Sequence, residues 1–259
     1  MKNLSLNKIH SQENSQLHIA AYMVLCVTFS CFPSLTNAAG WEIDPVRIEL
    51  STQQQTAALS VKNTTNQSTS IQIQAVTWSQ RDGKDIFAPT KELLVSPPIV
   101  TIAPKSEQIV RVALRRDADA AKELTYRLNL QELPPKQSAN FTGVKVALRV
   151  TLPVFVQSLN GGASPKMEWD IMRMPEDQLK VTLRNTGNAH VQISDFGLYA
   201  LGNEKAIAGE SGSSYVLQGQ THEWALKANS LDKVTNNRLR FTAFTDANNI
   251  DTEIVLHKP

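Results

Sequence analysis

The most regular pattern of apolar and polar residues lies between Gly143 and Gln157, which read GVKVALRVTLPVFVQ. Apolar residues alternate with mostly polar ones over about ten positions, and a period of two predicts a β-strand. The apolar row consists of Val144, Val146, Leu148, Val150 and Leu152. Such a strand exceeds the usual length of five or six residues, so we expect part of the row to serve as a binding surface and not to face its own core. The alternative is that the whole row faces its own core.

Shorter strand patterns, separated by turn residues, divide the rest of the sequence into two β-rich blocks. In the first block, the other predicted strands are 46–50, 57–62, 70–78, 93–95, 108–114 and 124–133. In the second block, they are 167–173, 178–184, 191–200, 215–217, 222–227, 238–245 and 250–257. Seven short strands in each block are typical of a β-sandwich. The sequence therefore predicts an all-β fold with two sandwiches in tandem.

The segment 159–165, LNGGASP, has the polar and glycine-rich composition of an interdomain linker. We therefore predict an N-terminal domain at residues 39–158 and a C-terminal domain at residues 166–259. The segment 117–124, DADAAKEL, has helical propensity but is short, so we expect a loop with at most one helical turn there.

The first 38 residues have the features of a secretory signal peptide. An apolar run, 19–35, follows two lysines and ends at the small residues Thr36-Asn37-Ala38. A transmembrane helix is the competing interpretation, but the run is short and contains Pro33. We therefore expect an exported protein without stable membrane insertion.

Composition excludes several classes of function. Both cysteines, Cys26 and Cys31, lie in the leader, so the mature chain has no disulfide and no sulfur ligand for a metal. The leader also holds two of the 26 basic and one of the 24 acidic side chains, which leaves 24 and 23. This balance gives no reason to expect a nucleic-acid partner.

No arrangement of residues indicates enzymatic chemistry. The histidines of the mature chain, His190, His222 and His257, belong to no recognisable metal-binding or catalytic motif. The segment 209–213, GESGS, lacks the final glycine of a nucleophile elbow, and 246–250, DANNI, lacks the glycine of a calcium loop. We therefore expect no enzyme activity, no cofactor and no metal.

Several segments of the first block, taken in order, resemble the periplasmic chaperones of the bacterial chaperone-usher pathway, which assemble fimbriae and pili. These segments are VRIEL at 46–50, SPP at 96–98, IAP at 102–104, VRV at 110–112, YRLNLQELPP at 126–135 and the strand at 143–157. The resemblance covers residues 41–157 well, and the second block only through its length, its strand count and 241–246. It implies two immunoglobulin-like sandwiches and the donation of a strand to a partner.

In this family, a pilin subunit lacks the last strand of its own sandwich, and the chaperone fills the groove with its G strand. The resemblance assigns that role to the five side chains of the apolar row, and it assigns Arg47 to the carboxylate at the subunit's C-terminus. The family's second anchor, a lysine on the G strand, is replaced here by Pro153. We predict that Arg127 takes its place, as in the archaic branch of these chaperones, because a guanidinium grips a carboxylate bidentately. The alternative for Arg127 is an ordinary solvated strand residue.

Three further charged residues, Arg111, Glu123 and Asp246, resemble the family's salt-bridge network between the two domains. Their implied role is to fix the angle between the domains, since a hydrogen-bonded charge cluster is costly to break. The alternative is that each is an ordinary surface charge.

The resemblance thus implies a periplasmic chaperone that binds pilin subunits and delivers them to an outer-membrane usher. An exposed strand edge also leaves open a homodimer in which each copy caps the other. The second hypothesis is a secreted adhesin or glycan-binding protein, which usually presents exposed aromatic platforms or calcium loops. The four tryptophans favour it little, because most lie in strand patterns typical of a core.

Overall fold

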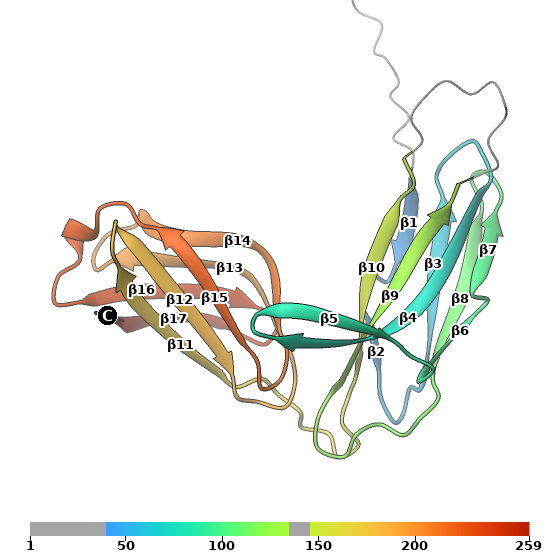
Figure 1. Cartoon of the computed structure of the whole chain (residues 1–259), viewed down its shortest axis with the longest axis horizontal. Coiled ribbons are helices and arrows are strands. Elements are labelled where there is room, and N and C mark those ends of the chain that lie inside the picture. Colours follow the sequence, from blue (N-terminus) through green and yellow to red (C-terminus); the bar gives the residue numbers. More distant parts are fainter. Residues whose placement is uncertain (1–39, 135–145, 259) are drawn as a thin grey trace, which may run out of the picture. The chain divides into compact units, whose positions relative to one another are not determined.

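The computed structural model describes residues 40–134 and 146–258 (Figure 1). The predicted signal peptide, residues 1–38, and the predicted donor residue Val144 lie outside the described residues. The described part of the chain consists of β-strands, their connections and one turn of 3₁₀-helix, η1 (Leu231–Lys233), and this part holds no helix long and apolar enough to cross a membrane. The predicted all-β fold class is confirmed.

The N-terminal sandwich consists of two sheets. The strand order of the first sheet is β1 (Trp41–Asp44), β3 (Thr56–Asn63), β8 (Glu107–Leu114) and β6 (Leu93–Ser96). The order of the second sheet is β2 (Ile48–Leu50), β10 (Arg149–Val156), β9 (Leu124–Leu133), β4 (Thr69–Arg81) and β5 (Lys84–Pro89), with β7 (Ile99–Ile102) also paired to β4. Both sheets contribute to one buried core, which includes Leu59, Val110, Leu128 and Val154.

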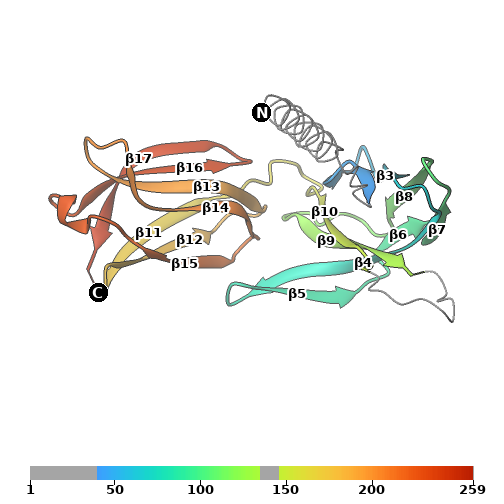
Figure 2. The ribbon, with the colours of Figure 1, turned by 90° about the horizontal axis from the view of Figure 1, so that it is seen from above.

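The C-terminal sandwich is one seven-stranded sheet that closes around its own core (Figure 2). Its order is β14 (Ala206–Val216), β13 (Val191–Ala200), β16 (Arg238–Thr245), β17 (Asn249–His257), β11 (Met167–Met174), β12 (Gln178–Asn185) and β15 (Thr221–Lys227). Val216 of the first strand and Trp224 of the last enter the same core, together with Phe241. The two ends of the sheet therefore face each other across shared apolar side chains.

Most predicted strands are present, and β9, β13 and β16 have the predicted bounds. Strands β1, β5 and β7 were not predicted from the sequence. Every residue of β5 is exposed. Because neither face of the strand is buried, its sequence lacks the alternation of apolar and polar residues from which strands were predicted. The Asp82-Gly83 pair, read as a break between strands, is the turn of the β4–β5 hairpin: both residues have positive φ, 52° and 71°, as this tight turn requires.

The two cores, drawn from residues 48–156 and 171–256, lie inside the predicted domain limits. The predicted linker is hydrogen-bonded at both ends: the Leu159 N–H donates to the Asp119 carbonyl (2.8 Å), and the Ser164 N–H donates to the Asn188 side chain (2.9 Å). The segment 117–124 is an irregular connection up to the start of β9, without the helical turn that its composition allowed.

Strand β10 is shorter than the pattern predicted, because it begins at Arg149 and not near Gly143. Along the apolar row, exposure falls steadily: Val146 is 79% exposed, Leu148 and Val150 are half-buried, and Leu152 is 4% exposed. Leu152 belongs to the core of the N-terminal sandwich. The prediction that Leu152 is a donated side chain is therefore corrected. The alternation is the same in the exposed and the buried part of the row, so it does not show where the core begins.

The two edges of β10 are paired to different extents. On one side, the whole strand pairs antiparallel with β9, from Arg149 opposite Gln131 to Val156 opposite Leu124. On the other side, β2 pairs only with the last three residues, beginning at Val154 opposite Ile48. Among the described residues, no strand pairs with this second edge from residue 149 to 153. The exposed end of the apolar row therefore adjoins an open strand edge.

Truncating a side chain at either end of the apolar row should affect the free energy of unfolding differently. Leu152→Ala should lower the free energy of unfolding by about 2 to 5 kcal/mol, because it leaves a cavity in the core. Val146→Ala should change it by less than about 0.5 kcal/mol. Urea denaturation of the isolated mature protein measures both values, and equal losses would contradict this division of the row.

Candidate functional site

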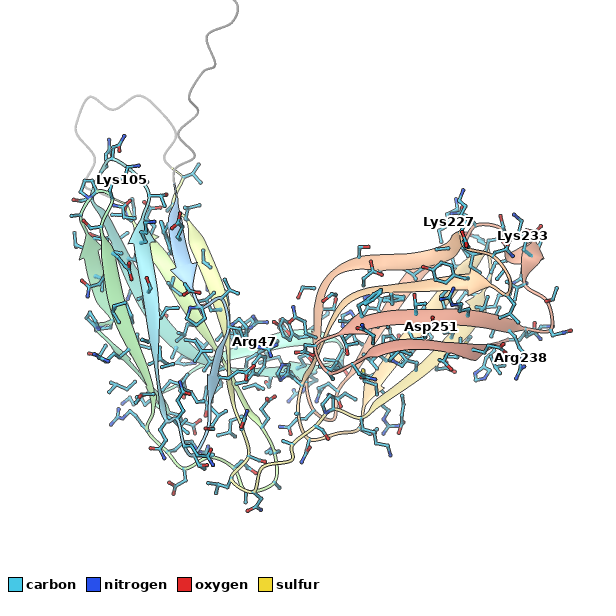
Figure 3. All side chains as sticks on the ribbon, turned by 180° about the vertical axis from the view of Figure 1, so that it is seen from behind. Arg47, Lys105, Lys227, Lys233, Arg238 and Asp251 are labelled. Atoms are coloured by element: carbon cyan, nitrogen blue, oxygen red, sulfur yellow. The ribbon has the colours of Figure 1, made fainter. Side chains whose placement is uncertain are left out.

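The two arginines predicted as an anchor lie on opposite sides of β10, Arg127 on β9 and Arg47 immediately before β2. Arg127 on β9 pairs directly with Pro153 of β10, so the two side chains share one face of the sheet. Arg47 precedes Ile48, which pairs with Val154 on the opposite edge of β10 (Figure 3). Neighbouring strands are about 4.8 Å apart, so the two arginines bracket the position at which the family's lysine is expected.

The guanidinium of Arg127 is held by aromatic rings and not by a carboxylate. Its central carbon lies 3.6 Å from the centre of the Trp78 ring and 5.2 Å from that of Tyr215. Burial lowers the pKa of Arg127, and its Nε has no hydrogen-bond partner. No acidic side chain of the described residues forms an ion pair with it. A desolvated cation in this state would be stabilised by an incoming anion.

The aromatic rings around Arg127 come from both sandwiches. Trp78 of β4 and Phe155 of β10 form a small buried cluster with Leu217, and Tyr215 of β14 packs against it. The ring centres of Trp78 and Tyr215 are 5.3 Å apart with an edge-to-face orientation, a favourable geometry for aromatic pairs. The side chain of Gln80 adds two hydrogen bonds, to the Tyr215 carbonyl (2.8 Å) and from the Leu217 N–H (2.9 Å).

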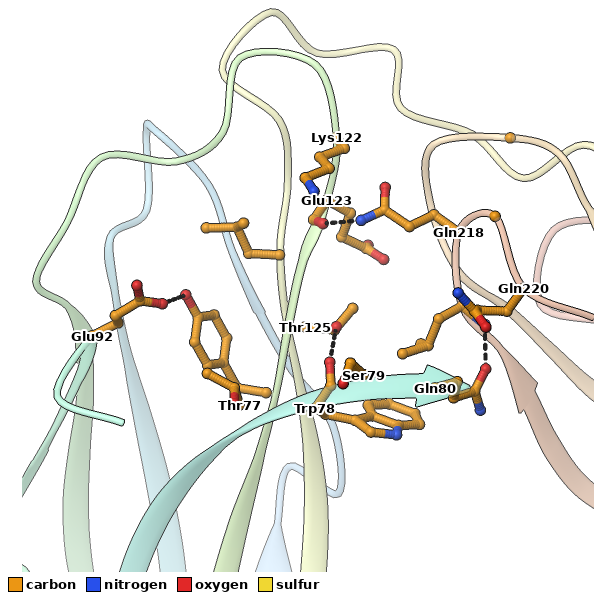
Figure 4. Close-up of a pocket in the computed structure, with 15 residues that line it drawn as sticks. Thr77, Trp78, Ser79, Gln80, Glu92, Lys122, Glu123, Thr125, Gln218 and Gln220 are labelled. Carbon is orange, nitrogen blue, oxygen red and sulfur yellow. Dashed lines mark hydrogen bonds between the residues drawn. The ribbon is translucent and has the colours of Figure 1, made fainter. Parts of the chain in front are cut away.

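A hollow of about 530 Å³ lies beside this cluster (Figure 4). Several of its polar groups already bond to one another: the Gln218 amide donates to the Glu123 carbonyl (3.1 Å), and the Tyr126 hydroxyl donates to Glu92 (2.6 Å). These polar groups are therefore already engaged within the protein. Within residues 40–134 and 146–258, no group of acidic, histidine or cysteine side chains is arranged to hold a metal ion.

Arg47 belongs to a charged cluster that contains two of the three predicted network residues. Its guanidinium bonds to Glu49 (2.6 Å) and to Asp246 (2.7 Å). The imidazole of His190 lies between Glu123, 2.6 Å from Nδ1, and Asp246, 3.3 Å from Nε2. Glu123 and Asp246 thus meet through a histidine that links the two sandwiches.

The electrostatics of the cluster favour its charged forms. Burial alone would raise the pKa of Asp246, but the adjacent His190 ring, the hydrogen bond from the Gln192 N–H and the ion pair with Arg47 lower it to about 2. Burial alone would lower the pKa of Arg47, but its bonds to Glu49 and Asp246 raise it. Both groups are therefore ionised throughout the neutral range.

Arg111 does not join this cluster. It lies on the outer, exposed face of β8, opposite Ala58 and Ser96, and forms no ion pair with any described residue. The sequence prediction grouped it with Glu123 and Asp246 by the resemblance of its local context. In the structure, Arg47 and His190 lie beside Asp246, where the prediction placed Arg111.

Sequence reasoning missed four side chains of the site: Trp78, Phe155, His190 and Tyr215. Only Phe155 carried a usable signal, because alternation along 143–157 places it on the face opposite Val154. None of the four tryptophans forms an exposed platform: Trp78 and Trp224 are buried, and Trp41 and Trp169 pack against the two cores. The structure thus offers no specific support for a glycan-binding protein.

The N-terminal sandwich coincides with a known family. Residues 40–158 match the family described as "Pili and flagellar-assembly chaperone, PapD N-terminal domain". This match covers the N-terminal sandwich, which is therefore similar to the N-terminal domain of pili-assembly chaperones. A comparison with curated protein sequences finds no match.

Solved structures share the two-sandwich fold. One is a complex of the CsuC chaperone with the tip subunit CsuE from archaic chaperone-usher Csu pili of Acinetobacter baumannii, with a TM-score of 0.60 and 22% identity over 85% of this chain and 100% of that chain. The second is the Salmonella enterica SafA pilin in complex with the SafB chaperone (0.57, 16%, 85% and 98%). The third is the Pseudomonas aeruginosa CupB2 chaperone (0.54, 18%, 83% and 100%).

The depressed pKa of Asp246 predicts a pH-dependent contribution to stability. Because its folded value of about 2 lies below the ordinary 3.8, the contribution is present above about pH 4 and is lost as the pH falls toward 2. At pH 7, Asp246→Asn should lower the free energy of unfolding by about 1 kcal/mol, since solvent screens a partly exposed carboxylate.

Urea titrations at several pH values measure this difference. Asp251→Asn serves as the control, because Asp251 on β17 pairs with Arg240 at the exposed surface (Figure 3) and should cause little change. A loss for Asp246→Asn that stays constant down to pH 3 would contradict the assigned role of its charge.

Proposed function

We propose that this chain is a periplasmic chaperone that binds pilin subunits by donating the segment that leads into β10, and then delivers them to an outer-membrane usher. The observation that carries the proposal is the exposed Val146 beside the unpaired edge of β10. An apolar row next to free backbone groups is a template for strand addition. The predicted signal peptide supports the location.

The binding energy would come from the free end of the apolar row. Val146 is almost fully exposed and Leu148 is half-buried, so a subunit's groove can bury both, together with the predicted donor Val144. Each fully buried side chain contributes about 1.5 to 3 kcal/mol before the costs of association. Val150 packs against the chaperone's own core and would join the donated part to the fixed part.

The register of the donated strand needs an anchor, because a slip by one residue would turn the row outward. We assign this task to Arg47 and Arg127, which bracket Pro153 on one face of the sheet. Arg127 lacks a carboxylate partner among the described residues and stacks on Trp78, so it is the group best prepared to bind the C-terminal carboxylate of a subunit. Arg47 would have to share its guanidinium with Asp246 and Glu49.

Two of the similar structures are complexes of a chaperone with a tip subunit or a pilin, which supports subunits of this kind as the partner. One of them belongs to an archaic pathway. That similarity, together with Pro153 in place of a lysine, supports a place for this chain in the archaic branch.

Val146→Glu should prevent capture of the subunit, because a carboxylate cannot enter an apolar groove without a large desolvation cost. The measurement is co-purification from the periplasm with a co-expressed candidate pilin subunit. Val255→Glu is the matched control, since Val255 is another exposed valine, on β17. Undiminished capture by the Val146→Glu variant would refute strand donation by this segment.

The anchor can be tested from both partners. Arg127→Gln should weaken binding of the native subunit by at least tenfold, which corresponds to a lost charge-assisted hydrogen-bond pair. It should weaken binding of a subunit extended by two C-terminal glycines much less, because that carboxylate is already displaced. Equal losses for both subunits in surface plasmon resonance would show that Arg127 acts on folding or packing instead.

A further inference from the structure

His190, immediately before β13, is a nearly buried ionisable group that carboxylates approach at both ring nitrogens. Its side chain is 9% exposed, and its ring stacks on Phe155 of β10 with centres 3.4 Å apart and planes inclined by 5°. Glu123, before β9, approaches one ring nitrogen, and Asp246, after β16, approaches the other. His190 belongs to the C-terminal sandwich. It is thus enclosed by Phe155 and Glu123 of the N-terminal sandwich and by Asp246 of the C-terminal sandwich.

The geometry specifies the charge of this ring. A neutral imidazole has one N–H donor and one acceptor nitrogen, whereas an imidazolium has two donors. Here Nδ1 is 2.6 Å from Glu123 Oε2 and Nε2 is 3.3 Å from Asp246 Oδ2. A neutral ring would turn a lone pair toward one of these carboxylates. The longer contact is mainly electrostatic, since Nε2 makes no well-aligned hydrogen bond.

We propose that His190, as an imidazolium, is the positioning residue of this cluster: while its ring is protonated, it holds Asp246 in place to bind Arg47 and locks the two sandwiches together. Asp246 Oδ2 is shared, at 2.7 Å from Arg47 Nη1 and 3.3 Å from the ring. Glu123 is tied to the same histidine twice, because it also accepts the His190 backbone N–H (3.0 Å). The effect on Arg47 as an anchor rests on the function proposed above, but the lock itself does not.

The surrounding charges set the direction of the pH dependence. The charged or titratable groups that face His190 are Glu123, Asp246, Arg47 behind Asp246, Glu49 behind Arg47, and Tyr215 with its ring centre 5.9 Å away. Burial alone would lower the pKa of His190, but the two carboxylates raise it above 6.5. The stabilisation is therefore complete below about pH 6.5 and is lost as the pH rises through the higher folded value.

Loss of this proton changes the balance of the whole cluster. With a neutral His190, the three carboxylates of Glu49, Glu123 and Asp246 face the single guanidinium of Arg47. Repulsion across the contact then increases, and Asp246 is held from one side only. The two sandwiches lose an ionic link while the aromatic contact of Phe155 remains.

The first experiment uses the mature protein without any partner. NMR titration of the three imidazoles of the mature chain should give His190 a pKa above 6.5. The melting temperature of His190→Gln should lie below that of the parent protein at pH 6, by about 2 to 4 °C or more, and the gap should close as the pH rises to 9. His257→Gln is the control, because His257 pairs with Asp170 at the exposed surface and should show no such gap.

A gap that is independent of pH, or a His190 that titrates below 6.5, would overturn the proposal. His190→Arg keeps a planar cation that can stack on Phe155, so this variant should retain the melting temperature at pH 6 and lose less of it at pH 9 than the parent. Failure of this variant at every pH would mean that the shape of the ring matters and its charge does not.

The second experiment separates the positioning role from the lock. With the co-purified pilin as the probe, the affinity of the parent protein should fall several-fold between pH 6.5 and 9, and that of His190→Arg should fall less. If Val146→Glu still captured the subunit, the proposed function would fail while the melting profile still reported on His190. If affinity were independent of pH in both proteins but the melting gap were present, the lock would stand and the effect on Arg47 would be refuted.

Discussion

The structure depends on the unequal pairing of β10. One edge of this strand is satisfied by β9 along its whole length, while β2 covers only the last three residues of the other edge. The same strand therefore contributes Leu152, Val154 and Val156 to the core of the N-terminal sandwich, while one of its edges has no partner among the described residues from 149 to 153. One continuous segment is thus buried in the core at its C-terminal end and exposed at its N-terminal end. The core holds the strand in place, and the exposed binding part extends from it.

The two sandwiches are joined by two kinds of contact, one aromatic and one ionic. The aromatic part, centred on Trp78 and Phe155, excludes water and does not depend on pH. The ionic part, centred on His190 and Asp246, lies beside it and does depend on pH. Phe155 belongs to both, because it packs on Trp78 and stacks on His190. The ring that follows the donor segment on β10 is thus also the ring on which the interdomain contact is built.

The sequence predicted the class of fold and the two blocks well, because alternation and turn residues are local signals. It failed where burial depends on a distant partner. Alternation in the segment 143–157 could not separate Val146 from Leu152, since both have the same local pattern and differ only in what lies opposite. Arg111 was grouped with Glu123 and Asp246 by local context alone, whereas His190, an isolated histidine in the sequence, reaches both carboxylates only after the chain folds. Arg127 was identified through a resemblance, and the register opposite Pro153 supplies its physical reason.

Pro153 has a further consequence for any strand that adds to the open edge. The Glu132 N–H donates to the Leu148 carbonyl, so the even-numbered residues of β10 direct their backbone groups toward β9 and the odd-numbered ones toward the open side. Arg149 and Thr151 can each offer an amide hydrogen there, but a proline at 153 has none to offer. An added strand therefore finds no amide donor at Pro153, immediately before the residue where pairing with β2 begins. The backbone of β10 itself thus limits how far another chain can pair along this edge.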